Sequence, residues 1–255
     1  MHPILFKFFN IKIYTYGFFM AVAFLMGLIF IKKEAARVGE SPEKTGDLAF
    51  YIIISGIIGA RLFYIITDFK TYLLHPLEIF KIWNGGLTFY GGFIAAFFTT
   101  IIYLKKNKLS LLKTMDIIAP GVALGHFFGR IGCFFAGCCY GKECDLPWSV
   151  VFTNQDTLAP AHIHLHPTQL YSSFTNFIIF IMLLLIRKYK KFNGEILLIY
   201  IFLYGITRSI IEIFRGDYRG HVFWEYISIS QIIGISASLT ALAAFIYIKR
   251  QSIKK

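Results

Sequence analysis

Three arginines lie inside or at the end of long apolar stretches, where a charged side chain is costly. These residues are Arg61, Arg130 and Arg208. A charge in the hydrocarbon layer of a membrane costs several kcal/mol unless it has a partner or binds a ligand, so arginines in such segments are candidates for function. If all three face the same side of the bilayer, they form a cationic site at one depth. The natural ligand of that site is an anionic group such as a lipid phosphate.

Polar residues follow a helical spacing around the third arginine. Tyr204, Arg208 and Glu212 are each four positions apart, so they share one face of a helix. Arg215 lies about one turn further along. The Glu212 carboxylate can hold the Arg208 guanidinium in one rotamer and partly neutralise it; the alternative is a buried ion pair that only locks helix packing. We favour a ligand site, because two further arginines at the same depth exceed what one glutamate can compensate.

Glycines surround a tyrosine at the start of another apolar segment. Residues 84–92 read NGGLTFYGG, in which Tyr90 is followed by Gly91 and Gly92. Glycine exposes backbone N–H groups and lets a ligand approach closely, but small residues also allow tight packing of membrane helices. Both interpretations stay open for the glycines alone. We favour a ligand site because Tyr90 is expected at the depth of the arginines.

The composition indicates a protein that crosses a membrane several times. Of the 255 residues, 56% are hydrophobic and only 16% are charged, which is too apolar for a soluble domain of this size. About 20 apolar residues cross the roughly 30 Å of hydrocarbon. Such windows occur at residues 14–31, 48–67, 86–104, 112–128, 169–186, 195–214 and 226–248. We therefore predict an all-α fold, in which residues 1–255 form a single domain, a polytopic membrane bundle of seven transmembrane helices.

The positive charges indicate a topology rather than binding to nucleic acid. The formal net charge is +12, and the lysines and arginines cluster at residues 32–44, 105–113, 187–191 and 249–255. Membrane proteins retain such clusters in the cytoplasm. This places the N-terminus outside and the C-terminus in the cytoplasm. The three arginines then all lie toward the outer side of the membrane.

The longest polar connection, residues 133–166, is predicted to form a small external cap. Residues 148–152 have the pattern of a short strand, and four cysteines lie in the segment: Cys133, Cys138, Cys139 and Cys144. Disulfides can form outside the cytoplasm, and we favour a disulfide-braced cap. Metal binding with His162, His164 and His166 is a weaker alternative, because a zinc-type C-x2-C spacing is missing. We expect no metal site and no cofactor.

The order of short motifs resembles the prolipoprotein diacylglyceryl transferase family along the whole chain. Each motif alone is weak, whereas eight in the same order are specific. They are Tyr16-Gly17, Gly59-Ala60-Arg61, His75-Pro76-Leu77-Glu78, Trp83-x-Gly85-Gly86, Phe89-Tyr90-Gly91-Gly92, Gly129-Arg130-Ile131-Gly132, His166-Pro167-Thr168-Gln169-Leu170-Tyr171, and Tyr204 with Arg208, Glu212 and Arg215.

The resemblance implies an enzyme of the bacterial inner membrane. Such an enzyme moves the diacylglyceryl group of phosphatidylglycerol onto the lipobox cysteine of a preprolipoprotein signal peptide, among the membrane lipids. It implies that Arg130 holds the lipid phosphate and that Arg208, positioned by Tyr204 and Glu212, assists. The other substrate-binding candidates are Tyr16, Arg61, Gly91, Gly92, Gln169 and Arg215. Two alternatives are a non-catalytic lipid-binding or lipid-moving protein, and a metal- or redox-handling membrane protein that uses the Cys/His cluster.

Departures from the family pattern concern the groups around the reaction. The family usually has histidine at Tyr90, and a phenol of ordinary pKa ~10 is a poor base at neutral pH. Cys133, Ala136 and Cys138 stand where the family has two asparagines and a glutamate. His166 is the nearest alternative base, although it can equally cap the following helix. The catalytic candidates are therefore Arg130, Arg208, Tyr90 and His166.

Reporter fusions test the topology independently of the family. Fusions after residues 38, 107, 190 and 253 are expected to report the cytoplasm, and those after residues 78, 155 and 219 the exterior. The reason is the retention of basic clusters on the cytoplasmic side. A reversed signal at any two of these sites would contradict the placement of the three arginines on one side of the membrane.

Overall fold

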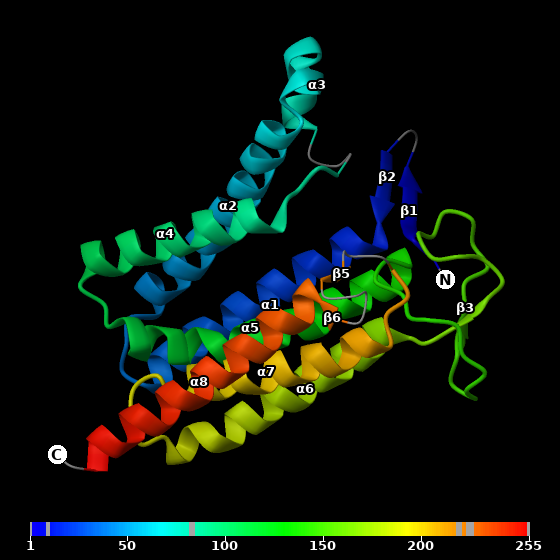
Figure 1. Ribbon diagram of the computed structural model, residues 1–255. Helices are drawn as coiled ribbons and strands as arrows, with labels where there is room; N and C mark the ends of the chain where they lie inside the picture. The colour runs from blue at the N-terminus through cyan, green and yellow to red at the C-terminus, as the bar shows by residue number, and fades with distance from the viewer. Residues whose placement is uncertain (1, 9–10, 82–84, 218–220, 223–226, 254–255) are drawn as a thin grey trace. The chain divides into compact units, whose positions relative to one another are not determined.

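The computed structural model describes residues 2–8, 11–81, 85–217, 221–222 and 227–253 (Figure 1). Within these residues, helices dominate and strands form only three two-stranded sheets, which confirms the predicted all-α class. The chain divides into two compact units. The main unit comprises residues 1–29 and 115–255, and the α2–α4 unit comprises residues 30–114.

Seven long helices coincide with the seven predicted windows. They are α1 (Thr15–Arg37), α2 (Pro42–Thr67), α4 (Phe89–Asn107), α5 (Leu111–Ala136), α6 (Thr168–Ile186), α7 (Glu195–Ile213) and α8 (Ile229–Ile253). In the described part of the chain, six of them are long and apolar enough to cross a membrane, and α4 is not among the six. The 19 residues of α4 include Gly91 and Gly92 and end in a turn with Lys105 and Lys106, which lowers its apolar character.

Short elements connect these helices. They are the hairpin β1 (Ile4–Phe8) and β2 (Ile11–Tyr14), the short helices α3 (Phe69–Leu74), η1 (Pro76–Phe80) and η3 (Arg187–Tyr189), and the sheets β3 (Val150–Val151) with β4 (His164–Leu165) and β5 (His221–Val222) with β6 (Ile227–Ser228). Leu73, Leu74, Leu77 and Phe80 of α3 and η1 are exposed. Exposed apolar side chains of this kind are typical of short segments that lie along the headgroup layer of a membrane.

Glycines bring α2 and α4 together within the α2–α4 unit. A side chain at Gly91 would collide with Phe63 and with the carbonyl oxygen of Gly59. A Cβ at Gly92 would lie 2.8 Å from the carbonyl oxygen of Gly56. Only residues without a side chain allow this approach of two backbones. Gly91 and Gly92 therefore have a packing role, and their contact with substrate stays a prediction.

One buried carboxylate joins α5 to α7 in the main unit. Asp116 accepts hydrogen bonds from the backbone N–H groups of Gly194 (2.7 Å) and Leu197 (2.8 Å), and its Oδ2 lies 2.7 Å from Nζ of Lys190. The first N–H groups of a helix have no partner inside that helix. Asp116 therefore caps α7 from the neighbouring helix, where the helix dipole also favours a negative charge.

This cap sets the register between the two helices. Asp116 and Gly194 are 78 positions apart (194 − 116 = 78). Ten positions further along both helices (126 − 116 = 10), the rings of His126 and Tyr204 stack with centroids 5.1 Å apart, again at a separation of 78 (204 − 126 = 78). A constant separation means that α5 and α7 run parallel and in register. Figure 1 shows both helices within the main unit.

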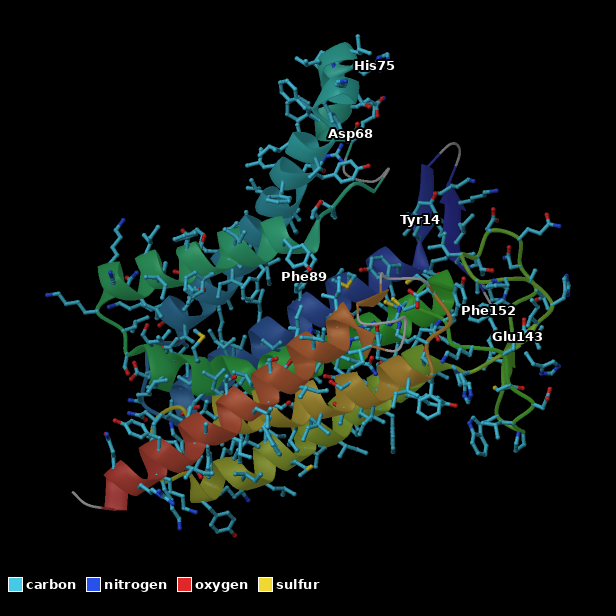
Figure 2. The ribbon with its side chains drawn as sticks, viewed as in Figure 1. Tyr14, Asp68, His75, Phe89, Glu143 and Phe152 are labelled. Atoms are coloured by element: carbon cyan, nitrogen blue, oxygen red, sulfur yellow. The ribbon has the colours of Figure 1, made fainter. Side chains whose placement is uncertain are left out.

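Residues 137–166 fold around a small apolar core. Val150 of β3 pairs with Leu165 of β4, and β3 lies inside the predicted strand. Phe152, labelled in Figure 2, is 1% exposed and packs with Ala159 and Leu165. All four cysteines lie outside disulfides, so the disulfide brace that we favoured is not present. The apolar core and β3–β4 hold the segment together instead.

Replacing Asp116 with alanine should lower the free energy of unfolding by roughly 2 to 3 kcal/mol, because two backbone donors and Lys190 lose a charged partner. Asp156→Asn, at an exposed position, is the control and should leave stability unchanged. Thermal unfolding in detergent micelles measures both variants. Equal stability of the two variants would show that Asp116 does not hold α7.

Candidate active site

Arg130 of α5 and Arg208 of α7 continue the register of these helices. They are also 78 positions apart (208 − 130 = 78). Each lies 14 positions beyond the Asp116 cap, about 21 Å along the helix axis at 1.5 Å per residue. The two guanidinium groups interact electrostatically with each other, and Tyr204 interacts with both. The parallel register therefore brings two arginines from distant parts of the sequence to one level.

The Glu212 carboxylate is shared by two arginines. Nη1 of Arg208 pairs with Oε2 of Glu212, and Nε of Arg215 lies 3.7 Å from the same oxygen. The three side chains are 12%, 6% and 3% exposed, respectively. The ion pair predicted from the spacing of four is confirmed. Its burial means that Glu212 fixes the orientation of the guanidinium group of Arg208.

Arg215 connects the end of α7 to residues 133–166, which contain the four cysteines and form the cysteine segment. Its Nε and Nη2 donate to Oδ1 and Oδ2 of Asp217 at 2.9 and 2.6 Å, and its guanidinium hydrogen-bonds to the sulfur of Cys139. Burial alone would lower the pKa of Arg215, but the bonds to Asp217 and Cys139 outweigh it and raise that pKa. The backbone of Arg215 also bridges to Gly141.

The arginines of this cluster outnumber the carboxylates. In the described part of this cluster, three cations (Arg130, Arg208 and Arg215) face two anions, Glu212 and Asp217, which leaves one positive charge (3 − 2 = 1). A buried cation without an anion is unfavourable. A ligand with one negative charge, such as a phosphodiester, completes the balance and accepts the guanidinium donors.

Two aromatic groups beside Arg130 extend this cluster. Tyr16 of α1 interacts electrostatically with Arg130, and its contact with substrate stays a prediction. His126 was missed by the sequence analysis. It lies one turn before Arg130, stacks on Tyr204, and its Nδ1 lies 3.1 Å from the hydroxyl of Tyr200. The spacing of four between His126 and Arg130 is the signal that would have found it.

Gln169 supports the cysteine segment from the start of α6. It is 1% exposed, and its Nε2 donates to the carbonyl oxygen of Cys138 at 2.8 Å. Its Oε1 is buried without a hydrogen-bond partner among the described residues. Thr168 donates in the same way to the carbonyl oxygen of Cys139 at 2.7 Å. The structure gives Gln169 a supporting contact, and its contact with substrate stays a prediction.

His166 lies where the cysteine segment meets α6. Its Nδ1 is 3.2 Å from the hydroxyl of Tyr171, and its ring packs on Phe214 with centroids 5.2 Å apart. Its backbone N–H donates to Lys142 and its carbonyl accepts from Gly141. These contacts hold His166 at a junction of three segments. Its role as a base stays a prediction.

Arg61 belongs to the α2–α4 unit, where backbone carbonyl groups surround it. The guanidinium is buried and donates to the carbonyl oxygens of Ile79 (3.1 Å), Gly85 (2.8 Å), Gly86 (3.1 Å) and Glu78. The Cζ atom lies 5.2 Å from the centre of the Tyr72 ring. Arg61 therefore holds η1 and the glycine loop before α4. Its contact with a lipid stays a prediction.

Tyr90 lies at the start of α4 and is open to its surroundings. Tyr90 is 54% exposed, and the centroid of its ring lies 6.0 Å from that of Phe89. An exposed hydroxyl is available to a ligand. Since Tyr90 and Arg130 belong to different units, a role for Tyr90 at the reaction centre stays a prediction.

In the described part of the chain, six helices are long and apolar enough to cross a membrane, which indicates a multi-pass membrane protein. Comparisons with known proteins define it further. The family model described as prolipoprotein diacylglyceryl transferase matches residues 3–247. A phosphatidylglycerol–prolipoprotein diacylglyceryl transferase of Clostridium tetani is 40% identical over 245 residues, which cover 96% of this chain and 97% of the relative.

Two further relatives extend the comparison. The phosphatidylglycerol–prolipoprotein diacylglyceryl transferase 2 of Clostridium perfringens is 36% identical, with 92% of this chain and 91% of the relative covered. A phosphatidylglycerol–prolipoprotein diacylglyceryl transferase of Finegoldia magna is 34% identical, with 100% of this chain and 98% of the relative covered. The chain belongs to the prolipoprotein diacylglyceryl transferase family, which confirms the resemblance of its motifs. It is a transferase, and the two alternatives without transferase activity are not favoured.

Glu212→Gln should lower the free energy of unfolding by about 3 kcal/mol, because it leaves Arg208 and Arg215 buried without their shared charge. Glu143→Gln, at an exposed carboxylate labelled in Figure 2, is the matched control. Thermal unfolding in detergent compares the two. Unchanged stability of Glu212→Gln would show that the carboxylate does not compensate the arginines.

Proposed function

We propose that this protein transfers the diacylglyceryl group of phosphatidylglycerol to the lipobox cysteine thiol of preprolipoproteins, the first step of bacterial lipoprotein maturation. Family membership and the names of its relatives support the reaction and both substrates. The observation that carries the proposal is the cluster of three arginines with two carboxylates. A cluster of this charge suits a lipid phosphate.

During the reaction, negative charge develops on the leaving group. The acceptor sulfur forms a bond to the terminal glyceryl carbon, the bond from that carbon to the phosphate oxygen breaks, and glycerol phosphate leaves with the electron pair. Cations that are already oriented stabilise this developing charge without reorganisation. In this proposal Arg130 holds the phosphate. Arg208, oriented by Glu212 and next to Tyr204, binds the oxygen that leaves.

The same proposal assigns the protein to the bacterial inner membrane. In it, α4 is a seventh span, the N-terminus lies outside and the C-terminus in the cytoplasm, and residues 133–166 form an external cap of a single domain. The support comes from the basic clusters, such as Lys105 and Lys106 in the last turn of α4, and from the packing of α4 on α2. In this proposal two further candidates lie beside the phosphate: Tyr16, which interacts electrostatically with Arg130, and Arg215, which hydrogen-bonds to Cys139.

Arg130→Ala and Arg208→Ala should each abolish transfer in a protein that still inserts and folds. Removing one oriented donor costs about 3 kcal/mol of transition-state stabilisation, or a rate loss of about 100-fold or more. Rescue of a strain depleted of its own transferase, with thermal unfolding to check folding, is the measurement. Arg250→Ala, an exposed arginine of α8, is the control and should rescue growth. Near-normal turnover in either folded site variant would remove that arginine from the reaction.

Tyr90→Phe and His166→Gln separate two candidates for the proton acceptor. If Tyr90 only donates a hydrogen bond to the headgroup, Tyr90→Phe should reduce the rate modestly, by less than about tenfold. If Tyr90 is the base, Tyr90→Phe should be inactive and His166→Gln tolerated. We expect the first outcome, because a thiol is much more acidic than a phenol. An active double variant would exclude both residues as the acceptor.

A further inference from the structure

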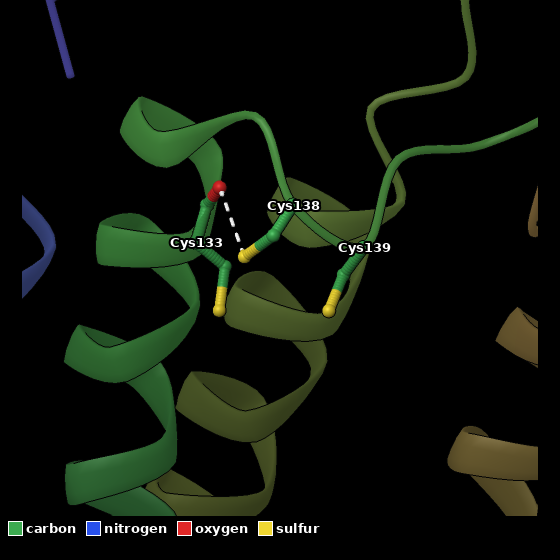
Figure 3. A group of neighbouring side chains, drawn as sticks. All are labelled: Cys133, Cys138 and Cys139. Atoms are coloured by element: carbon green, nitrogen blue, oxygen red, sulfur yellow. Dashed lines mark hydrogen bonds between the residues drawn. The ribbon is translucent and has the colours of Figure 1, made fainter. Parts of the chain in front are cut away.

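Three cysteines converge on one point at the end of α5. Cys133 lies in the last turn of the helix, and Cys138 and Cys139 follow the next turn of the chain. Their sulfur atoms all lie within 4.8 Å of one another (Figure 3). In the described part of the chain, this is the one group of three or more potential metal ligands with such spacing. Cys144 lies outside the group.

The backbone brings these thiols together before any ligand binds. Gly137 and Cys139 have positive φ values of 74° and 59°, which turn the chain back toward α5. This conformation is costly for a residue with a side chain. Figure 3 shows Cys138 above Cys133, whose carbonyl oxygen lies 3.7 Å from the Cys138 sulfur. The bonds from Thr168 and Gln169 to the carbonyl groups of this turn hold it in place.

Three thiolates in this arrangement match the ligand set of a zinc ion. Zn–S bonds of ~2.3 Å in a tetrahedron place the sulfur atoms roughly 3.8 Å apart, so a contraction of at most about 1 Å completes the site. Three protein ligands leave the fourth position open, which is the pattern of catalytic zinc sites. The cysteines are only partly buried, so the open position can be reached.

Positive charge next to the thiols favours an anionic metal complex. Arg130 interacts electrostatically with Cys133 and Cys139, and Arg215 hydrogen-bonds to the sulfur of Cys139. Three thiolates and one divalent ion carry a net charge of −1, which these guanidinium groups stabilise. A guanidinium has five N–H donors, so Arg130 can contact the thiolates and a phosphate at the same time.

We propose that Cys133, Cys138 and Cys139 bind a Zn²⁺ ion whose fourth ligand is the acceptor thiol of the preprolipoprotein. This inference rests on the proposed function. Zinc deprotonates a coordinated thiol, so a strong protein base is no longer required.

The step is balanced without a redox change. The three protein thiols release their protons when zinc binds. The acceptor thiol then releases its own proton to solvent as its sulfur joins the ion. That sulfur attacks the glyceryl carbon, and the electron pair of the breaking carbon–oxygen bond leaves on the phosphate oxygen. The product thioether is neutral and dissociates from the ion.

The first test is the metal content of the full-length protein purified under reducing conditions. Elemental mass spectrometry should find one zinc per chain in the wild type and in Cys144→Ser, and at least a tenfold lower occupancy in Cys133→Ser and Cys139→Ser. Cys138→His keeps a ligand and should retain zinc, which separates loss of a ligand from misfolding. Zinc-free wild type, or a disulfide among the three cysteines, would overturn the proposal.

The second test detects the acceptor thiol without turnover. Cobalt is exchanged for zinc, and a lipobox peptide is added in the absence of phosphatidylglycerol. The sulfur-to-cobalt absorption should rise by about one third as a fourth thiolate binds, and a peptide with serine for cysteine should leave it unchanged. Equal spectra with both peptides would overturn the proposal that the acceptor thiol is the fourth ligand of the metal ion. Turnover by zinc-free enzyme would overturn it as well, while leaving the proposed function intact.

Discussion

The position of Asp116 against the first turn of α7 determines the level at which the site forms. The cap fixes α5 and α7 in parallel register, and the arginines of the two helices then meet 14 residues beyond it. Three guanidinium groups repel one another, so the helices must be held by contacts away from the site. The Asp116 cap and the stack of His126 on Tyr204 supply those contacts. The protein thus keeps an unbalanced positive charge at one end of a fixed helix pair.

The two units use arginine in opposite ways. Arg61 is surrounded by backbone carbonyl groups of its own unit, and its guanidinium donors hold a loop in place. Arg208 and Arg215 are balanced by Glu212 and Asp217, so the positive charge that remains for a ligand is that of Arg130. Burial in an apolar segment therefore does not by itself identify a ligand-binding arginine. The partners of the guanidinium decide its role.

The sequence predicted those features that depend on local periodicity. Apolar windows located the seven long helices, and the spacing of four predicted the Arg208–Glu212 pair. Features that depend on loop conformation were missed. The partners of Arg61 are carbonyl groups of a loop whose path the sequence does not reveal. The cysteine cluster depends on the positive φ of Cys139, which no residue pattern indicates.

The measurement that tests the central claim most directly is transfer by the purified protein reconstituted in lipid vesicles. A lipobox peptide is added, and its mass is followed with phosphatidylglycerol or with a diacylglycerol that lacks a phosphate. With phosphatidylglycerol, each peptide should gain one diacylglyceryl thioether, and glycerol phosphate should be released. Neither product should form with the lipid that lacks a phosphate, or with phosphatidylglycerol and the Arg130→Ala variant. Product from the lipid without phosphate, or no product from either lipid, would contradict an arginine site that acts on a phosphate leaving group.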